Sequence, residues 1–135
     1  MAQVPTPKPS NYAFGIKQEE ALKSRIQSAL GEQIQKTLPR YAQMDFYSEH
    51  HYIELKSRRA PILPDSYDTW LLPTCKGPKD DEKETVYFYY FEQDDSLWYL
   101  LYDEEQFVTY KRATPYWHPT RQEHYYIPRS EFTRL

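Results

Sequence analysis

The chain has 135 residues, a mass of 16.4 kDa, a mean hydropathy of −0.92 and a formal net charge of −3. This length suits one domain, and no apolar run approaches the ~20 residues of a membrane-spanning helix, so the sequence predicts no membrane partner. The 14 Tyr, 6 Phe and 3 Trp supply enough apolar surface to exclude a disordered chain, while only 3 Gly and the lack of repeats exclude collagen-like and solenoid folds.

The cysteine content points to a reducing environment. Cys75 is the single cysteine, so no internal disulfide can form, and the N-terminal segment lacks the apolar core of a signal peptide. Both features favour a reducing compartment, and we therefore expect an intracellular protein. Cys75 has no adjacent His that would activate it, and we interpret it as an inert thiol.

The N-terminal third predicts an arm followed by a helix. Residues 1–11 carry three prolines among polar residues, which predicts an extended arm, and residues 12–135 are then expected to form a single domain. Across residues 15–38 the apolar side chains recur on one stripe at about 100° per residue, which is typical of an amphipathic helix. Pro39 is expected to end this helix.

The next segment, residues 41–58, changes to a period of two. Apolar and polar residues alternate on either side of a polar run at 48–51, which predicts a β-hairpin with one apolar face against the helix and one polar face. His50 and His51 lie at its tip. Adjacent strand residues point to opposite faces, so we expect these two histidines to be exposed rather than paired as metal ligands.

The remainder predicts an irregular segment and then strands. Residues 60–82 are rich in proline and charge, and around the short apolar stretch at 67–72 we expect irregular chain with one or two helical turns. Segments dense in β-formers predict strands at 85–91, 97–102 and 107–111.

Turn residues at 93–96 predict a hairpin between the first two of these strands. Residues 114–124 predict a further loop, and residues 125–127 an edge strand before Pro128. The order of helix, hairpin, loop and several strands predicts a small α+β domain with a mixed or antiparallel sheet.

The hairpin carries the residues on which a functional prediction rests. Glu54 and Lys56 are two positions apart on one strand, so their side chains project from the same face. If the hairpin closes on a two-residue turn at Glu49 and His50, Asp45 lies directly across from Glu54, with Cβ atoms about 4.5–5.5 Å apart. Two carboxylates this close repel each other unless a cation lies between them. A Mg²⁺ or Mn²⁺ ion would resolve the repulsion, and Lys56 could orient the attacking water or stabilise charge on a phosphate.

The helix contributes a third carboxylate, Glu19. It falls in the middle of the apolar stripe of the predicted helix, where a lone buried charge costs several kcal/mol and therefore needs a partner. The metal site on the neighbouring hairpin could be that partner, directly or through water. The alternative is an acid in the first turn that complements the helix dipole.

These residues together resemble the PD-(D/E)xK nuclease superfamily. The run from Gly15 to Glu19, then Asp45, then the Glu54-Leu55-Lys56 strand follow that family's order, and the resemblance spans roughly residues 14–100. It implies a restriction-endonuclease-like core, with a helix packed on a sheet that carries a catalytic hairpin. It also implies Mg²⁺- or Mn²⁺-dependent cleavage of DNA, in which Asp45 and Glu54 ligate the metal, Glu19 assists and Lys56 is the catalytic lysine.

The resemblance has further consequences and some departures. Many phage and large-DNA-virus nucleases share this core, which implies a viral protein acting in the cytoplasm or nucleus of a host cell, or carried in a virion. Met44 stands where the family name places proline, and the short spacing from Asp45 to Glu54 requires a tight hairpin. Members often carry a further Gln or Lys on a helix after the Glu-x-Lys strand. Lys76 is the nearest equivalent, although Pro73 and Gly77 leave little helix around it.

A local basic cluster follows the predicted active strand. Because the net charge of the chain is negative, any surface that binds nucleic acid must be local. Abundant Tyr and Trp could provide stacking platforms, although most of the tyrosines are expected in the core. The residues expected to contact DNA are Lys56, Arg58, Arg59 and Lys76, with Lys79, Lys111, Arg112 and Arg121 as extensions of the same surface.

Two classes of function remain open from the sequence. The first is a metal-dependent phosphodiesterase acting on DNA. The second is a non-catalytic structural or interaction module on the same fold, for example a virion or assembly component. This alternative is favoured by the acidic net charge, the Tyr-rich strands and the proline-rich arm. The resemblance also implies a possible homodimer.

Overall fold

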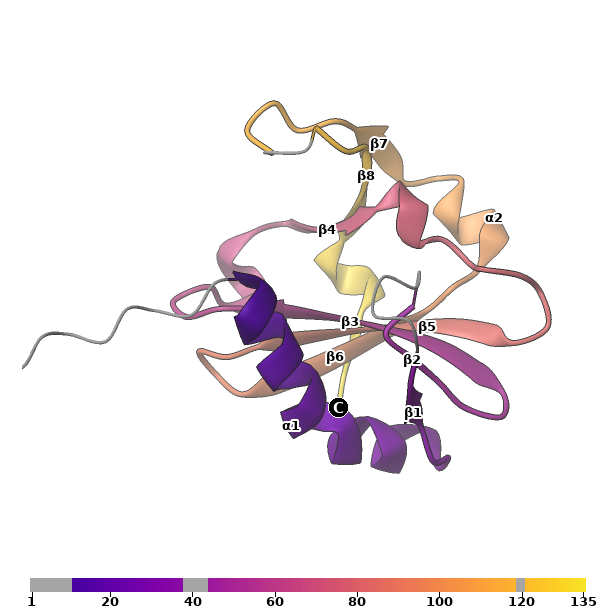
Figure 1. Ribbon diagram of the computed structural model, residues 1–135. Coiled ribbons are helices and arrows are strands. Elements are labelled where there is room, and N and C mark those ends of the chain that lie inside the picture. Colours follow the sequence, from indigo (N-terminus) through magenta and orange to yellow (C-terminus); the bar gives the residue numbers. More distant parts are fainter. Residues whose placement is uncertain (1–10, 38–43, 119–120) are drawn as a thin grey trace, which may run out of the picture.

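The computed structural model describes residues 11–37, 44–118 and 121–135 (Figure 1). The predicted arm therefore lies outside the described residues, apart from Asn11, which belongs to the first helix. The elements in chain order are α1 Asn11–Leu30, β1 Gln35–Lys36, β2 Phe46–Tyr47, β3 His51–Arg58, η1 Pro64–Ser66, β4 Thr69–Pro73, η2 Thr74–Lys76, β5 Glu84–Phe91, β6 Ser96–Leu101, α2 Glu104–Phe107, β7 Lys111–Ala113, β8 His124–Pro128, η3 Arg129–Glu131 and β9 Thr133–Arg134.

The predicted N-terminal helix exists, but its end was predicted wrongly. It ends at Leu30 because Gly31 adopts a left-handed conformation, with φ of 68°, and donates its N–H to the Gln27 carbonyl over 2.9 Å. Ile34 follows the helix and is nevertheless buried, which explains why it continued the apolar stripe. In the described part of the chain, no helix is long and apolar enough to cross a membrane.

Gly31→Ala is expected to lower the free energy of unfolding by about 1 kcal/mol, because alanine strains the left-handed backbone at this position. A Cβ would meet no atom within 4 Å there, so the backbone conformation alone sets the cost. Gly15→Ala is the matched control. Gly15 lies inside α1 with equal space around it, and alanine there should stabilise by about 0.5–1 kcal/mol. Urea unfolding of both variants measures the difference, and a stabilising Gly31→Ala would contradict this account of the helix end.

A six-stranded mixed sheet forms the centre of the fold, in the order β1-β2-β3-β5-β6-β9. Strands β3 and β5 are parallel, and the other neighbours are antiparallel. Helix α1 lies across one face of this sheet (Figure 1). The predicted α+β class with a mixed sheet is thereby confirmed.

The predicted hairpin is present as β2 and β3. Its register pairs Phe46 with Ile53 and Tyr47 with Tyr52, as expected for the short turn at Glu49. The predicted first strand began at residue 41, and residues 41–43 lie outside those described. The β2 strand begins at Phe46, so the hairpin is shorter than its sequence pattern.

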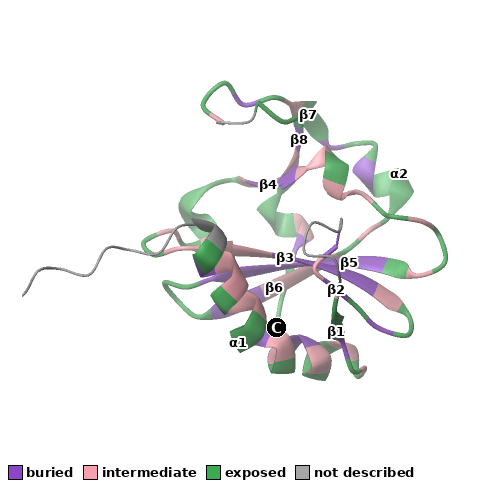
Figure 2. Cartoon of the chain, viewed as in Figure 1, coloured by how far each residue is buried: buried purple, intermediate pink, exposed green. Residues whose placement is uncertain are grey.

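Strand β5 separates two apolar cores because it is buried on both faces (Figure 2). Its side chains alternate, as strand geometry requires. Val86, Phe88 and Tyr90 pack with α1, while Tyr87, Tyr89 and Phe91 pack on the opposite side of the sheet. The α1 core also contains Ile53 and Leu55, so Glu54 and Lys56 of β3 face the second core.

A second, three-stranded sheet in the order β4-β8-β7 covers that other face, and the sequence did not predict it. The stretch at 67–72 was expected to be irregular, but Trp70 and Leu72 belong to β4 and are buried against β5. The predicted edge strand at 125–127 is β8, which lies at the centre of this sheet. The short helical turns expected in this region are present as η1 and η2.

The prediction of a strand at 107–111 was wrong, whereas the turn at 93–96 is confirmed between β5 and β6. Helix α2 occupies Glu104–Phe107, because the Asp103 carboxylate caps it by accepting the N–H groups of Glu105 and Gln106 at 3.0 and 3.4 Å. Phe107 is buried in the second core. It is helical in spite of its β propensity, because the cap at Asp103 starts a helix just before it.

Candidate functional site

Asp45 lies one residue before β2, at the point where the hairpin pairing begins. Its N–H donates to the Ile53 carbonyl over 3.0 Å, and its Oδ2 accepts the N–H of Leu55 over 2.8 Å. The side chain thus takes the place of a backbone acceptor for β3. Asp45 was predicted to pair directly across from Glu54 as a strand residue. The paired residues of β2 begin at Phe46, one position later, but the Asp45 carboxyl is still close enough to Glu54 that each shifts the pKa of the other.

Glu54 is enclosed at the centre of β3. The residue is 1% exposed, and neither of its two carboxylate oxygens has a hydrogen-bond partner. Two ammonium groups lie at ion-pair distance from Oε2, Lys56 Nζ at 3.5 Å and Lys76 Nζ at 3.3 Å. A buried carboxylate with so few donors is costly and is uncommon outside functional sites. A solvated polar face is therefore excluded for this position.

The cover over Glu54 comes from the second sheet. The hydroxyl of Tyr87 donates to the Lys76 carbonyl, and that of Tyr89 donates to the Leu71 carbonyl, each over 2.7 Å. Burial raises the pKa of both tyrosines, so these hydroxyls remain protonated donors. The two bonds fasten β4 and η2 to β5, the neighbour of β3 in the sheet, and η2 in turn carries Lys76 to Glu54.

Glu19 of α1 reaches the same group of acids from the other side. Its carboxyl contacts Lys36 Nζ of β1 and shares a hydrogen bond with Asp45. The sequence placed Glu19 on a buried face in need of a partner, and the structure supplies Lys36 and Asp45. Whether Glu19 assists a metal ion stays a prediction.

The three acids do not ionise alike. Burial raises the pKa of Glu54 to about 8, and the neighbouring Asp45 carboxyl adds to the rise. Burial also raises the pKa of Glu19 to about 7, against the hydrogen bond from Lys36. For Asp45, burial is outweighed by the neighbouring Glu54 and Glu19 carboxyls and by the Leu55 N–H, and the pKa is lowered. Near neutral pH, Asp45 is thus ionised, Glu54 keeps its proton and Glu19 is close to half protonated.

The carboxylates of Asp45 and Glu54 are the candidate ligands for a divalent ion. Among residues 11–37, 44–118 and 121–135, no three His, Cys, Asp or Glu side chains are grouped so that they could hold a metal ion. Mg²⁺, however, is commonly bound by one or two carboxylates, with waters and substrate phosphates completing its shell. The Glu54 oxygens without N–H or O–H donors, next to ionised Asp45, fit that limited requirement.

The basic residues predicted to contact DNA are divided between two faces. Arg58 donates to the Leu71 carbonyl over 3.3 Å and lies 5.4 Å from the centre of the Tyr89 ring, on the side of the second sheet. Arg59 lies 4.9 Å from the ring centre of Phe14 in α1. They do not form one patch, although each leaves part of its side chain accessible.

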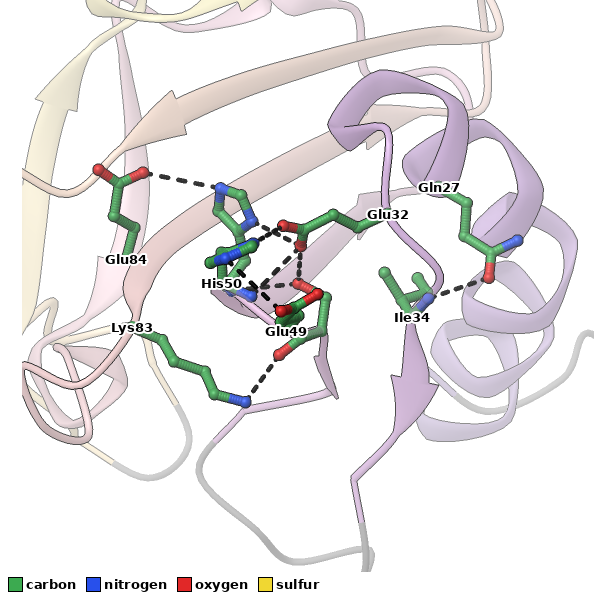
Figure 3. Close-up of polar contacts among 9 residues, drawn as sticks. Gln27, Glu32, Ile34, Glu49, His50, Lys83 and Glu84 are labelled. Carbon is green, nitrogen blue, oxygen red and sulfur yellow. Dashed lines mark hydrogen bonds and ion pairs between the residues drawn. The ribbon is translucent and has the colours of Figure 1, made fainter.

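A second polar cluster fastens the hairpin tip to the loop after α1 (Figure 3). Glu32 accepts from Ser48 Oγ and contacts Nδ1 of His50 at 2.5 Å and Nδ1 of His51 at 3.0 Å. Lys83 donates to the Ser48 carbonyl over 2.7 Å. Hydrogen bonds from Ser48 and the histidines lower the pKa of Glu32 to about 2, and Glu32 raises the pKa of His50. The prediction that both histidines are merely exposed was wrong for His51, which is half-buried.

Glu32→Gln is expected to lower the pKa of His50 toward 6.5 by removing its charged partner. Because the folded state raises this pKa, the contribution of His50 to stability is present below pH 6.5 and lost as the pH rises through the raised value. NMR titration of the His50 ring measures the shift. Glu49→Gln is the comparison variant: its exposed carboxylate, 3.9 Å from the ring, also raises the pKa of His50 but through charge alone, so a smaller decrease is expected than in Glu32→Gln. An unchanged pKa in Glu32→Gln would contradict the assignment.

Sequence reasoning missed three residues that shape the acid site: Lys36, Tyr87 and Tyr89. Lys36 lies just after the helix that was predicted to continue through it, so its role was hidden by the misplaced helix end. The two tyrosines were recognised only as β-formers. Their alternation with Val86 and Phe88 was a usable signal, because a strand with one hydroxyl-bearing face often holds another layer through hydrogen bonds.

Comparison of the chain with protein-family models, with curated proteins and with solved structures gives no significant match.

Proposed function

We propose that this chain is a metal-dependent nuclease of the PD-(D/E)xK type, which hydrolyses DNA phosphodiester bonds. The observation that carries the proposal is the Glu54 carboxylate, which is buried without a hydrogen-bond partner, lies next to the Asp45 carboxyl and is flanked by Lys56. On this proposal, the β2–β3 hairpin is the catalytic hairpin of a restriction-endonuclease-like core.

Asp45 and Glu54 would hold Mg²⁺ or Mn²⁺. The bound ion would supply a Lewis acid and a water of lowered pKa. Lys56 lies on the same face of β3 as Glu54, so its ammonium would orient the attacking water or stabilise the developing phosphate charge. Glu19 would support Asp45 through their shared hydrogen bond.

The substrate side of the proposal rests on the accessible cations. Lys56 and Lys76 are each about a quarter exposed, with side-chain exposures of 23% and 24%, so their ammonium groups face both Glu54 and the exterior. Arg58, on the side of the second sheet, and Arg59, on the side of α1, would each contact DNA phosphates. A viral source, action inside a host cell and a homodimeric assembly belong to the same proposal, through the family resemblance alone.

The test is cleavage by the purified chain. Duplex, branched and single-stranded DNA are incubated with Mg²⁺, with Mn²⁺ or with EDTA, and we expect cleavage only where a divalent ion is present. Failure to cut any of the three substrates with either ion would overturn the proposal. The non-catalytic module would then be favoured, in which Lys56 and Lys76 serve only to neutralise Glu54.

A further inference from the structure

The loop between β7 and β8 carries two aromatic rings in solvent. Tyr116 is 89% exposed and Trp117 is 61% exposed. Pro115 anchors the start of the loop because it is buried, and its carbonyl accepts the N–H of His118 over 3.1 Å. The tight turn leaves the two rings outside either core, and Figure 1 shows this loop projecting from the three-stranded sheet.

Such exposure is unusual in this chain, where aromatic rings build the second core. Trp70 packs against Phe91 and Phe132 with ring centres 4.8 and 4.3 Å apart. Tyr116 and Trp117 make no comparable contribution to either core. Two adjacent large rings left in water are typical of a binding surface rather than of folding.

The residues that flank these rings in the sequence are mostly basic. Lys111, Arg112 and Arg121 are exposed on the same β7–loop–β8 unit, and Glu123 is the only acid between Val108 and His124 in the sequence. The chain as a whole carries a net charge of −3, so this unit is locally opposite in sign. Aromatic rings flanked by lysine and arginine suit a single-stranded polyanion, whose bases stack while its phosphates meet the cations.

The loop base is continuous with the acid site. The ring of His118 lies 5.9 Å from Trp117 and 4.8 Å from His124, centre to centre. His124 is buried, pairs with Pro73 across β4 and β8, and lies within the electrostatic reach of Lys56 and Arg58. Pro73 directly precedes η2, which carries Lys76 to Glu54. The loop is thus joined through β8 and β4 to the element that carries Lys76.

We propose that the β7–β8 loop binds unpaired nucleotides by stacking their bases on Tyr116 and Trp117. This rests on the proposed nuclease function and adds the substrate class, which is DNA with a single-stranded segment. Paired bases present only their edges to a protein, so fully paired duplex cannot use these rings and would be held through phosphates alone.

Binding without cleavage tests the proposal separately from catalysis. Fluorescence anisotropy in EDTA compares a labelled oligo(dT) strand, a duplex and an abasic oligomer of equal length. The Tyr116→Ala/Trp117→Ala double variant is expected to bind oligo(dT) at least about tenfold more weakly, since base stacking on an aromatic ring contributes roughly 1–3 kcal/mol. Binding of duplex and of the abasic oligomer should change less than about threefold, because both use mainly phosphate contacts.

Tyr67→Ala is the matched control, because Tyr67 is 62% exposed on a different loop. It should bind oligo(dT) like the parent chain. The proposal is overturned if the double variant binds oligo(dT) as the parent does, or if the abasic oligomer binds as tightly as oligo(dT); a protein contact would then account for the rings. Intact oligo(dT) binding with no cleavage under any divalent ion would instead contradict only the nuclease proposal.

Discussion

Glu54→Gln is expected to reduce divalent-dependent DNA cleavage by about a thousandfold or more. The substitution keeps the size of the side chain but removes the negative charge that, with Asp45, would hold the ion. Metal stabilisation of a phosphoryl transition state contributes several kcal/mol, and each 1.4 kcal/mol corresponds to about tenfold in rate. The glutamine amide would also lie beside Lys56 and Lys76 with a donor group where an acceptor stood.

The controls separate this loss from unfolding. Glu20→Gln makes the same chemical change on the exposed face of α1, one residue from Glu19, and should retain parental cleavage. Lys56→Ala should lose activity by about a hundredfold, whereas Lys17→Ala, also exposed on α1, should not. Circular dichroism checks that each variant is folded. Glu54→Gln or Lys56→Ala with cleavage within about threefold of the parent would contradict the assigned roles.

The part of the site that could be predicted is the part made by local periodicity. Glu54 and Lys56 share a face because strand residues alternate, and the hairpin register follows from the short turn after Tyr47. The meeting of Asp45 with Glu54 follows from the same register. Its detail does not, because the Asp45 side chain binds the Leu55 N–H in place of a backbone carbonyl.

The burial of Glu54 could not be predicted from its neighbours in sequence. Its cover consists of β4 and η2, and β4 is held by pairing with β8, far along the chain. The Pro-rich composition of 60–82 suggested an irregular segment, whereas Pro73 sits at the end of β4, where it interrupts little pairing. Tertiary pairing therefore outweighed local composition.

The misplaced helix end and the false strand have the same kind of cause. Ile34 continued the apolar stripe, but Gly31 ended the helix through its positive φ, and Ile34 is buried in the α1 core from the loop that follows. At Phe107, the aromatic ring indicated a strand, while the carboxylate of Asp103 supplied a helix cap just before it. In both places one capping residue outweighed the hydrophobic pattern.

The free energy of unfolding is expected to fall as the pH rises from about 5 to 8, by roughly 3 kcal/mol, because of Glu54. The folded state raises its pKa from 4.5 to about 8, so between these values the folded chain keeps a proton that the unfolded chain releases. Stability therefore decreases with pH across this window. Glu19, with its pKa raised to about 7, acts in the same direction. The contribution of Asp45, whose pKa is lowered, is present above pH 3.8 and is lost only as the pH falls below that value, outside this window.

Glu54→Gln should remove most of this pH dependence and raise stability at pH 8 by about 2 kcal/mol, since it removes a buried charge with few donors. Glu20→Gln should leave the slope unchanged.

At pH 8, Mg²⁺ or Mn²⁺ at a hundred times its dissociation constant should stabilise the parent chain by about 2.7 kcal/mol and Glu54→Gln by far less. Denaturant unfolding at each pH, with and without the ion, measures both effects. A parental slope in Glu54→Gln would contradict the raised pKa of Glu54, and equal stabilisation of both chains by the ion would place the metal elsewhere. Because the charge that destabilises the apo chain is the charge that would hold the ion, the variant that gains stability is expected to be the one that loses cleavage.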